Sequence, residues 1–262
     1  MTDGLALCRG AAEDVRAVLV ELPTRAAREP VLSQGEGGDD TTAIDAAAER
    51  VILARFDGLD ATIVSEEVGE LGSGRTRVVI DPIDGSLNAK RGVPFFSLSI
   101  AVADGDTMND VDFAYVYDFG SGEEWTARRG EGVFLDGVPL ASQRPKERIE
   151  LLAFEATLTR EVAERAAAFD GIAHRLRIMG SLALSLCHLA AGRLDGVCSL
   201  KPYRSVDVAA AQLLVRERGL AIANVDGTDS FLDAPLDLTP RSRVAAAGTD
   251  DVCRQVISAL SA

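Results

Sequence analysis

The stretch IDPIDGSLN at residues 80–88 constrains what this chain can fold into more than any other part of the sequence. The apolar run RVVI at 77–80 predicts a buried strand, which ends on two carboxylates, Asp81 and Asp84. Gly85 and Ser86 follow and indicate the start of a helix. Carboxylates bind hard divalent cations, and the free N–H groups of a helix start bind phosphate oxygens. The pattern therefore favours a metal-assisted phosphate site, although Asp-Pro and Asp-Gly are also common in solvated turns.

Length and composition allow a well-packed protein and exclude several classes. The chain has 262 residues, enough for one large domain or two smaller halves, and 47% of them are hydrophobic. No apolar run reaches the ~18 residues of a membrane span, and the N-terminus lacks the pattern of a signal peptide. The four cysteines are scattered, which fits neither a metal knuckle nor a disulfide framework. We therefore expect a reduced, cytoplasmic location.

The net charge of −14 argues against nucleic acid and anionic membranes as partners, because such a surface repels them. The same charge opposes the binding of an anionic phosphate, so bound cations would have to reverse the field locally. Lysine is nearly excluded, since Lys90, Lys146 and Lys201 are the only three. An acidic, lysine-poor composition also suits a high-salt cytoplasm, where self-repulsion is screened.

Hydrophobic periodicity predicts strands mainly in the first half and alternating strands and helices in the second. Helices are expected over 5–29, 42–59, 160–169, 181–191 and 205–219. Strands are expected over 61–64, 77–80, 94–105, 112–119, 123–128, 133–135, 150–154, 175–181 and 196–200. Residues 33–42 are rich in Gly and Asp, which indicates a mobile loop. This order predicts an α+β fold of layered sheets and helices, with halves at 1–147 and 148–262.

Further carboxylates would join the two aspartates of IDPIDGSLN if neighbouring strands end at the same edge. Glu66 and Glu67 end the preceding strand, and Asp207 stands in the first turn of the helix that Ser205 is expected to cap. Each has a simpler explanation: a solvated turn for the glutamates and a favourable helix dipole for Asp207.

Three other polar patterns have structural explanations. Thr42-x-x-Asp45 has the spacing of a capping box. Residues 104–110, DGDTMND, resemble a calcium loop, but Met108 and the missing glycine break that pattern, so a hairpin turn is expected. His174 and His188 are the only histidines, and a structural role is expected for both.

The order of motifs along the chain resembles the inositol monophosphatase superfamily, which includes the archaeal-type fructose-1,6-bisphosphatases. The resemblance rests on Asp45, then Glu66–Glu67, then DPIDGS at 81–86, and then SVDVAA at 205–210. Residues 175–197 are similar to the family's segment between the last two motifs. SLNAKRGVPFF and KPYRSVDVAAA look closest to the archaeal dual-specificity enzymes. The resemblance implies a layered α-β-α-β-α sandwich of the sugar-phosphatase type, and a homodimer.

The resemblance also implies two to three Mg²⁺ ions held by oxygen ligands, with Mn²⁺ as a substitute. The first ion would be bound by Glu66, Asp81 and the carbonyl of Ile83, the second by Asp81, Asp84 and Asp207, and a weaker third near Glu66, Glu67, Asp39 and Asp40. One ion would lower the pKa of a bound water. The Ser86 hydroxyl would be hydrogen-bonded to Asp45, which would draw off the water's proton. The N–H groups of Gly85, Ser86 and Leu87 would hold the phosphate.

The second half should decide the substrate. Inositol-specific members carry an acidic residue seven positions before the last metal aspartate, where this chain has Leu200. Substrate contacts are expected from Arg177, Ser181, Leu182, Lys201 and Arg204, and the three cations among them suit a second phosphate. This favours fructose 1,6-bisphosphate, hydrolysed at its 1-phosphate, with inositol 1-phosphate in the same site, and a place in gluconeogenesis. The alternatives are a 3′-phosphoadenosine nucleotide, histidinol phosphate, or a non-catalytic role in protein interaction.

Overall fold

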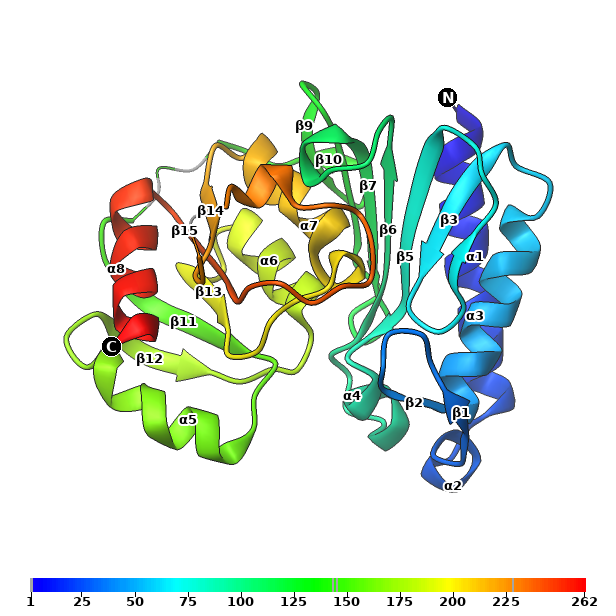
Figure 1. Cartoon of the computed structure of the whole chain (residues 1–262), viewed down its shortest axis with the longest axis horizontal. Coiled ribbons are helices and arrows are strands. Elements are labelled where there is room, and N and C mark those ends of the chain that lie inside the picture. The colour runs from blue at the N-terminus through cyan, green and yellow to red at the C-terminus, as the bar shows by residue number, and fades with distance from the viewer. Residues whose placement is uncertain (1, 143, 145, 228) are drawn as a thin grey trace.

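Two large β-sheets form the centre of the computed structural model, which describes residues 2–142, 144, 146–227 and 229–262 (Figure 1). The eight-stranded sheet runs in the order β10 (Val138–Pro139), β9 (Gly132–Leu135), β8 (Glu124–Arg128), β7 (Val111–Asp118), β6 (Ser97–Ala103), β5 (Thr76–Asp84), β3 (Ala61–Ser65) and β4 (Gly69–Leu71). The five-stranded sheet runs in the order β12 (Ala173–Arg177), β11 (Ile149–Glu155), β13 (Gly196–Ser199), β15 (Val244–Ala247) and β14 (Ala221–Asn224). A short hairpin joins β1 (Val31–Gln34) to β2 (Asp40–Thr42).

Helices form three layers around these sheets (Figure 1). The outer face of the eight-stranded sheet is covered by α1 (Thr2–Glu21) and α3 (Ala43–Phe56). Between the two sheets lie α6 (Leu182–Ala190) and α7 (Ser205–Glu217), while α5 (Thr159–Arg165) and α8 (Asp250–Ser261) lie beyond the five-stranded sheet. Two short helices complete the set, α2 (Arg25–Arg28) and α4 (Ser86–Arg91), with single 3₁₀ turns at 108–110, 166–169 and 231–233. The expected α-β-α-β-α sandwich is confirmed.

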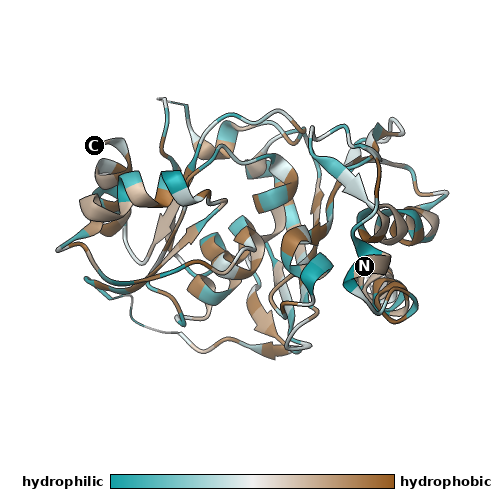
Figure 2. Cartoon of the chain, turned by 90° about the horizontal axis from the view of Figure 1, so that it is seen from below, coloured by the Kyte–Doolittle hydropathy of each residue, from teal (hydrophilic) through white to brown (hydrophobic). Residues whose placement is uncertain are grey.

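Each interface between layers holds a hydrophobic core. The largest surrounds α6 and α7 between the sheets, a second lies under α1 and α3, and a third lies under α8. In the view from below, coloured by hydropathy, hydrophobic residues are prominent along the strands in the middle of the molecule (Figure 2). All four cysteines are buried free thiols, as expected from their spacing. Among the described helices, none combines the length and hydrophobicity that crossing a bilayer requires.

Several expected boundaries differ from the structure for local reasons. The helix expected over 5–29 ends at Glu21, because Pro23 cannot donate the next helical hydrogen bond, and α2 starts separately with Thr24 as its cap. The expected loop at 33–42 contains strands β1 and β2 on either side of residues 35–39. Strand β5 does not end at Ile80 but continues through Asp84. The 104–110 segment is the expected connection between two antiparallel strands, β6 and β7.

The cap of α7 was predicted wrongly. Arg204, not Ser205, is the N-cap residue, and its backbone N–H donates to Asp207 Oδ2 at 2.6 Å. Ser205 lies inside the first turn and donates its hydroxyl to the Asp237 carbonyl at 2.6 Å. The backbone contacts of this turn anchor Asp207 where α7 meets the eight-stranded sheet. Helix α7 comes from the second half of the chain but covers the sheet that the first half builds. The division into halves at 147/148 stays a prediction.

Candidate active site

The parallel pairing of β3 with β5 brings the first two carboxylates together. Ser65 and Ile80 are register partners, so Glu66, the first residue after β3, comes beside Asp81, which lies within β5. Asp81 is 2% exposed, and its Oδ1 accepts the N–H of Ile83 at 3.0 Å. The neighbouring strands that the sequence argument required are therefore present.

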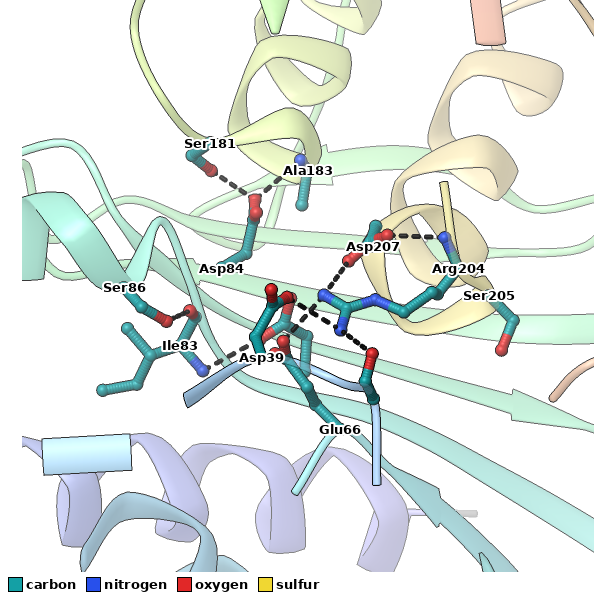
Figure 3. Close-up of polar contacts among 12 residues, drawn as sticks. Asp39, Glu66, Ile83, Asp84, Ser86, Ser181, Ala183, Arg204, Ser205 and Asp207 are labelled. Atoms are coloured by element: carbon teal, nitrogen blue, oxygen red, sulfur yellow. Dashed lines mark hydrogen bonds and ion pairs between the residues drawn. The ribbon is translucent and has the colours of Figure 1, made fainter. Parts of the chain in front are cut away.

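Asp84 is held by the start of α6. Its Oδ2 accepts the Ser181 hydroxyl and the Ala183 N–H, the latter at 2.8 Å (Figure 3). Ser181 also caps α6, as predicted, by accepting the Leu184 N–H at 3.2 Å. Gly85 follows in the left-handed region, with φ of 96°, and a Cβ there would lie 2.9 Å from the Gly180 carbonyl oxygen. Only glycine allows this close approach between the two segments.

Asp207 completes the carboxylate cluster, which we define as Glu66, Asp81, Asp84 and Asp207. The guanidinium of Arg204 lies among these side chains (Figure 3). It reaches Glu66 Oε1 at 2.7 Å and Asp207 Oδ1 at 3.3 Å. It also pairs with Asp39 Oδ2 at 3.3 Å. Arg204, expected to contact substrate, therefore pairs with carboxylates, although it also lines the neighbouring cleft.

One guanidinium does not neutralise this cluster. Burial raises the pKa of Glu66 to about 8, although Arg204 opposes the shift. Burial likewise raises the pKa of Asp84 to about 7 and holds the pKa of Asp81 well above its usual range, with Glu66 adding to the effect on Asp81. Arg204 shows the reverse: burial lowers its pKa, but the Asp207 and Glu66 carboxylates outweigh this and raise it. The cluster lacks positive charge.

The donor set fits hard divalent cations. All four side chains offer only oxygen, and the excess of buried carboxylates is relieved by a cation of charge two. As they stand, no three His, Cys, Asp or Glu side chains in the described part of the chain are arranged to hold a metal ion. Figure 3 shows the Arg204 side chain lying among the carboxylates instead.

The expected catalytic pair is separated by other hydrogen bonds. Ser86 Oγ donates to the Ile83 carbonyl at 2.9 Å, and no hydrogen bond among the described residues joins it to Asp45. Asp45 Oδ2 instead accepts the N–H of Thr42 at 3.1 Å and its hydroxyl, so the capping-box interpretation is confirmed. The prediction of a Ser86–Asp45 hydrogen bond was therefore wrong: Ser86 Oγ bonds to Ile83, and Asp45 Oδ2 bonds to Thr42. Asp45 Oδ1 is buried and has no hydrogen-bond partner among the described residues.

The residues expected near a third ion have different partners. Glu67 Oε2 accepts the Thr41 hydroxyl, which ties β3 to β2. Asp39 pairs with Arg204, and Asp40 begins β2. Gly37 N–H donates to the Glu66 carbonyl at 2.9 Å, so residues 35–39 lie directly over the cluster.

A cleft of about 540 Å³ opens beside the cluster. It is lined by five residues from the expected substrate and metal sets besides Asp84 and Asp207, namely Asp39, Leu87, Leu182, Lys201 and Arg204. Ser181 is buried against Asp84, and Leu200 is 4% exposed. Arg177 does not line this cleft: it is exposed on β12 and donates to the Leu176 carbonyl at 2.9 Å. Of the three expected phosphate-binding cations, Lys201 alone lines the cleft without a carboxylate partner among the described residues.

Glu155, at the end of β11, is a site residue that the sequence interpretation missed. It is 1% exposed and accepts the Gly180 N–H at 2.8 Å and the Ser185 hydroxyl at 2.7 Å. These bonds hold the turn that presents Ser181 to Asp84. A glutamate at the end of an apolar strand was the available signal. His188, by contrast, has the expected structural role, since it packs between Phe95 and Trp125.

Replacing Glu155 by glutamine should change how stability depends on pH. Burial raises the pKa of Glu155 from its ordinary 4.5 to about 7, so the folded protein holds its proton more tightly than the unfolded chain. In wild type, the contribution of Glu155 to the free energy of unfolding is fully present below pH 4.5 and is lost as the pH rises towards 7. Glutamine does not ionise. The free energy of unfolding of Glu155→Gln, relative to that of wild type, should therefore rise by up to about 3 kcal/mol between pH 5 and 8.

Urea unfolding of both proteins across this pH range, without metal, measures the difference. The matched control is Glu150→Gln on the same strand, an exposed side chain paired with Lys146, which should show no such gain. A difference between Glu155→Gln and wild type that stays constant with pH would contradict the prediction.

Comparison with known proteins places this arrangement in a family. Residues 5–261 match the inositol monophosphatase family. The chain is 32% identical over 251 residues to the fructose-1,6-bisphosphatase/inositol-1-monophosphatase of Archaeoglobus fulgidus, covering 94% of this chain and 93% of the relative. It is 34% identical over 213 residues to Nus factor SuhB of Escherichia coli, covering 76% and 77%.

A solved structure agrees along the whole chain. The MJ0109 gene product, an inositol monophosphatase-fructose 1,6-bisphosphatase, superposes with a TM-score of 0.85 at 25% identity, covering 97% of this chain and 98% of the other. Sequence and fold point to the same family. The chain therefore belongs to the inositol monophosphatase family.

Proposed function

We propose that this protein is a Mg²⁺-dependent phosphatase that hydrolyses phosphomonoesters of small sugars and polyols. Its first substrates are fructose 1,6-bisphosphate, at the 1-phosphate, and inositol 1-phosphate. The observation that carries the proposal is the meeting of Glu66, Asp81, Asp84 and Asp207 beside a cleft that also holds Lys201. The archaeal relative that matches 94% of the chain is named for both activities, which supports the same pair of substrates here.

The residues present suit this chemistry. Glu66, Asp81, Asp84, Asp207 and the Ile83 carbonyl would hold two ions, and Glu67 and Asp39 are near enough to the cluster for a third. Bound Mg²⁺ would supply Lewis-acid activation of water and of the leaving oxygen. Asp45 offers as a proton acceptor its Oδ1, which has no hydrogen-bond partner in the part of the chain that the structure describes. Lys201, exposed in the cleft, would bind the second phosphate of a bisphosphate as a point charge.

The protein is proposed to be a cytoplasmic homodimer. Four buried free thiols suit the reducing cytoplasm, and the family resemblance supports a homodimer. If the bisphosphate is the cellular substrate, the reaction belongs to gluconeogenesis. The similarity to Nus factor SuhB favours one second candidate, a role in protein interaction that does not depend on hydrolysis.

Phosphate release with Mg²⁺ tests these roles directly. We expect turnover of fructose 1,6-bisphosphate and inositol 1-phosphate, and little of a 3′-phosphoadenosine nucleotide, measured side by side at low and high KCl. Chelation by EDTA should abolish all turnover. Hydrolysis of inositol 1-phosphate alone would remove the second-phosphate role of Lys201. Failure on all three with Mg²⁺ bound would favour the interaction role.

A further inference from the structure

Arg204 occupies an unusual place for a cation beside a metal site. Its side chain is 13% exposed, and the guanidinium contacts two carboxylates of the cluster, Glu66 at 2.7 Å and Asp207 at 3.3 Å. Within the described residues, no other cation makes an ion pair with either of them. We propose that Arg204 is a built-in counter-cation, which competes with a divalent metal ion for Glu66 and Asp207 and holds residues 35–39 over the site until metal displaces it. This inference rests on the metal site of the proposed function.

Competition follows from the shared oxygens. A divalent ion bound by Glu66 and Asp207 takes oxygens at roughly 2.0–2.6 Å and repels a guanidinium at the same atoms. Four carboxylates meet here and Arg204 supplies one positive charge, whereas one divalent ion supplies two. The metal is therefore the better counter-ion, and the guanidinium must leave these oxygens for it to enter.

The backbone lets this happen without disturbing Asp207. The N–H of Arg204 donates to Asp207 Oδ2 at 2.6 Å, and this bond, not the guanidinium, forms the start of α7. The side chain also lines the cleft of about 540 Å³, which gives it room to turn away from the cluster. There its charge joins that of Lys201 on the side where an anionic substrate would bind.

The same guanidinium reaches the segment at 35–39. Its Nη1 donates to the Gly37 carbonyl at 3.2 Å and pairs with Asp39 Oδ2 at 3.3 Å. A Cβ at Gly37 would lie 2.5 Å from Nη1, so the guanidinium packs directly against the backbone of this segment. Arginine suits the task because its planar fork of donors reaches several acceptors at once, which a lysine ammonium does not match. Displacement of Arg204 therefore removes two of the contacts that hold this segment down.

Metal binding to Arg204→Gln tests the competition without relying on activity. Calorimetric titration of Mg²⁺, and separately Mn²⁺, into the metal-stripped protein should give about tenfold tighter binding than wild type, because a competing charge-assisted pair is gone. The matched control is Arg241→Gln, which makes the same change in net charge but breaks a pair with Asp237 and a hydrogen bond to the Thr239 carbonyl, both outside the cluster. Its affinity should stay close to wild type. Arg204→Lys, which keeps the charge but not the fork, should fall between wild type and Arg204→Gln.

Hydrogen exchange of residues 35–39 provides the second measurement. In wild type, Mg²⁺ should speed exchange in this segment, whereas in Arg204→Gln exchange should already be fast without metal. Equal or weaker metal affinity in Arg204→Gln, with wild-type binding and hydrolysis intact, would overturn this inference alone. Absence of Mg²⁺ and Mn²⁺ binding in every variant would overturn the proposed function, and this inference with it.

Discussion

Replacing Asp84 by asparagine should lower phosphate release by about a thousandfold or more, the largest loss we expect from a single substitution. Asp84 is 8% exposed at the centre of the cluster. Asparagine keeps an oxygen for the Ser181 hydroxyl and the Ala183 N–H but removes the charge. Metal ions contribute several kcal/mol of transition-state stabilisation, so losing a ligand charge has an effect of this size. Steady-state release of phosphate from fructose 1,6-bisphosphate and inositol 1-phosphate measures it.

Asp118→Asn is the matched control, because Asp118 is also buried but accepts hydrogen bonds from Gly120 and Ser121, outside the cluster. Its turnover should stay close to wild type. Circular dichroism should show that Asp84→Asn remains folded. If Asp84→Asn kept its activity, the cluster would not be the catalytic centre.

Replacing Lys201 by alanine should separate the two substrates. Lys201 is exposed in the cleft and is the only lysine among the described residues that line it. A charge-assisted hydrogen bond to a phosphate is worth about 1.5–3 kcal/mol, which predicts a loss of about ten- to a hundredfold in kcat/KM for fructose 1,6-bisphosphate. Inositol 1-phosphate has no second phosphate, so its kcat/KM should change little.

Lys146→Ala provides the control for the loss of a lysine from this acidic protein. Lys146 pairs with Glu150 at 2.7 Å and does not line the cleft. Both substrates should be hydrolysed by this variant at wild-type rates. An equal loss on both substrates in Lys201→Ala would show that Lys201 supports the site in general and does not recognise a second phosphate.

Local sequence was enough to predict the elements that carry the carboxylates. The apolar run before Asp81, the glycine after Asp84 and the acidic first turn of α7 each act over a few residues, and propensity and capping are local effects. Bringing Glu66 close to Asp81 required the further assumption that β3 and β5 are neighbours. Their parallel pairing supports that assumption. Where local reasoning failed, a nearby competitor was responsible. Pro23 divides the first helix, and Arg204 takes the cap position expected for Ser205.

The sequence by itself determined which side chains this protein offers: oxygen donors in a fixed order, almost no lysine, and a glycine between strand and helix. The tertiary structure alone decided which of them meet. Arg204 contacts Glu66 across 138 positions of sequence, and Ser181 contacts Asp84 across 97. Such contacts depend on how α6 and α7 pack between the two sheets, which no short stretch of sequence specifies. The same packing places Lys201 in the cleft and leaves Arg177 outside it.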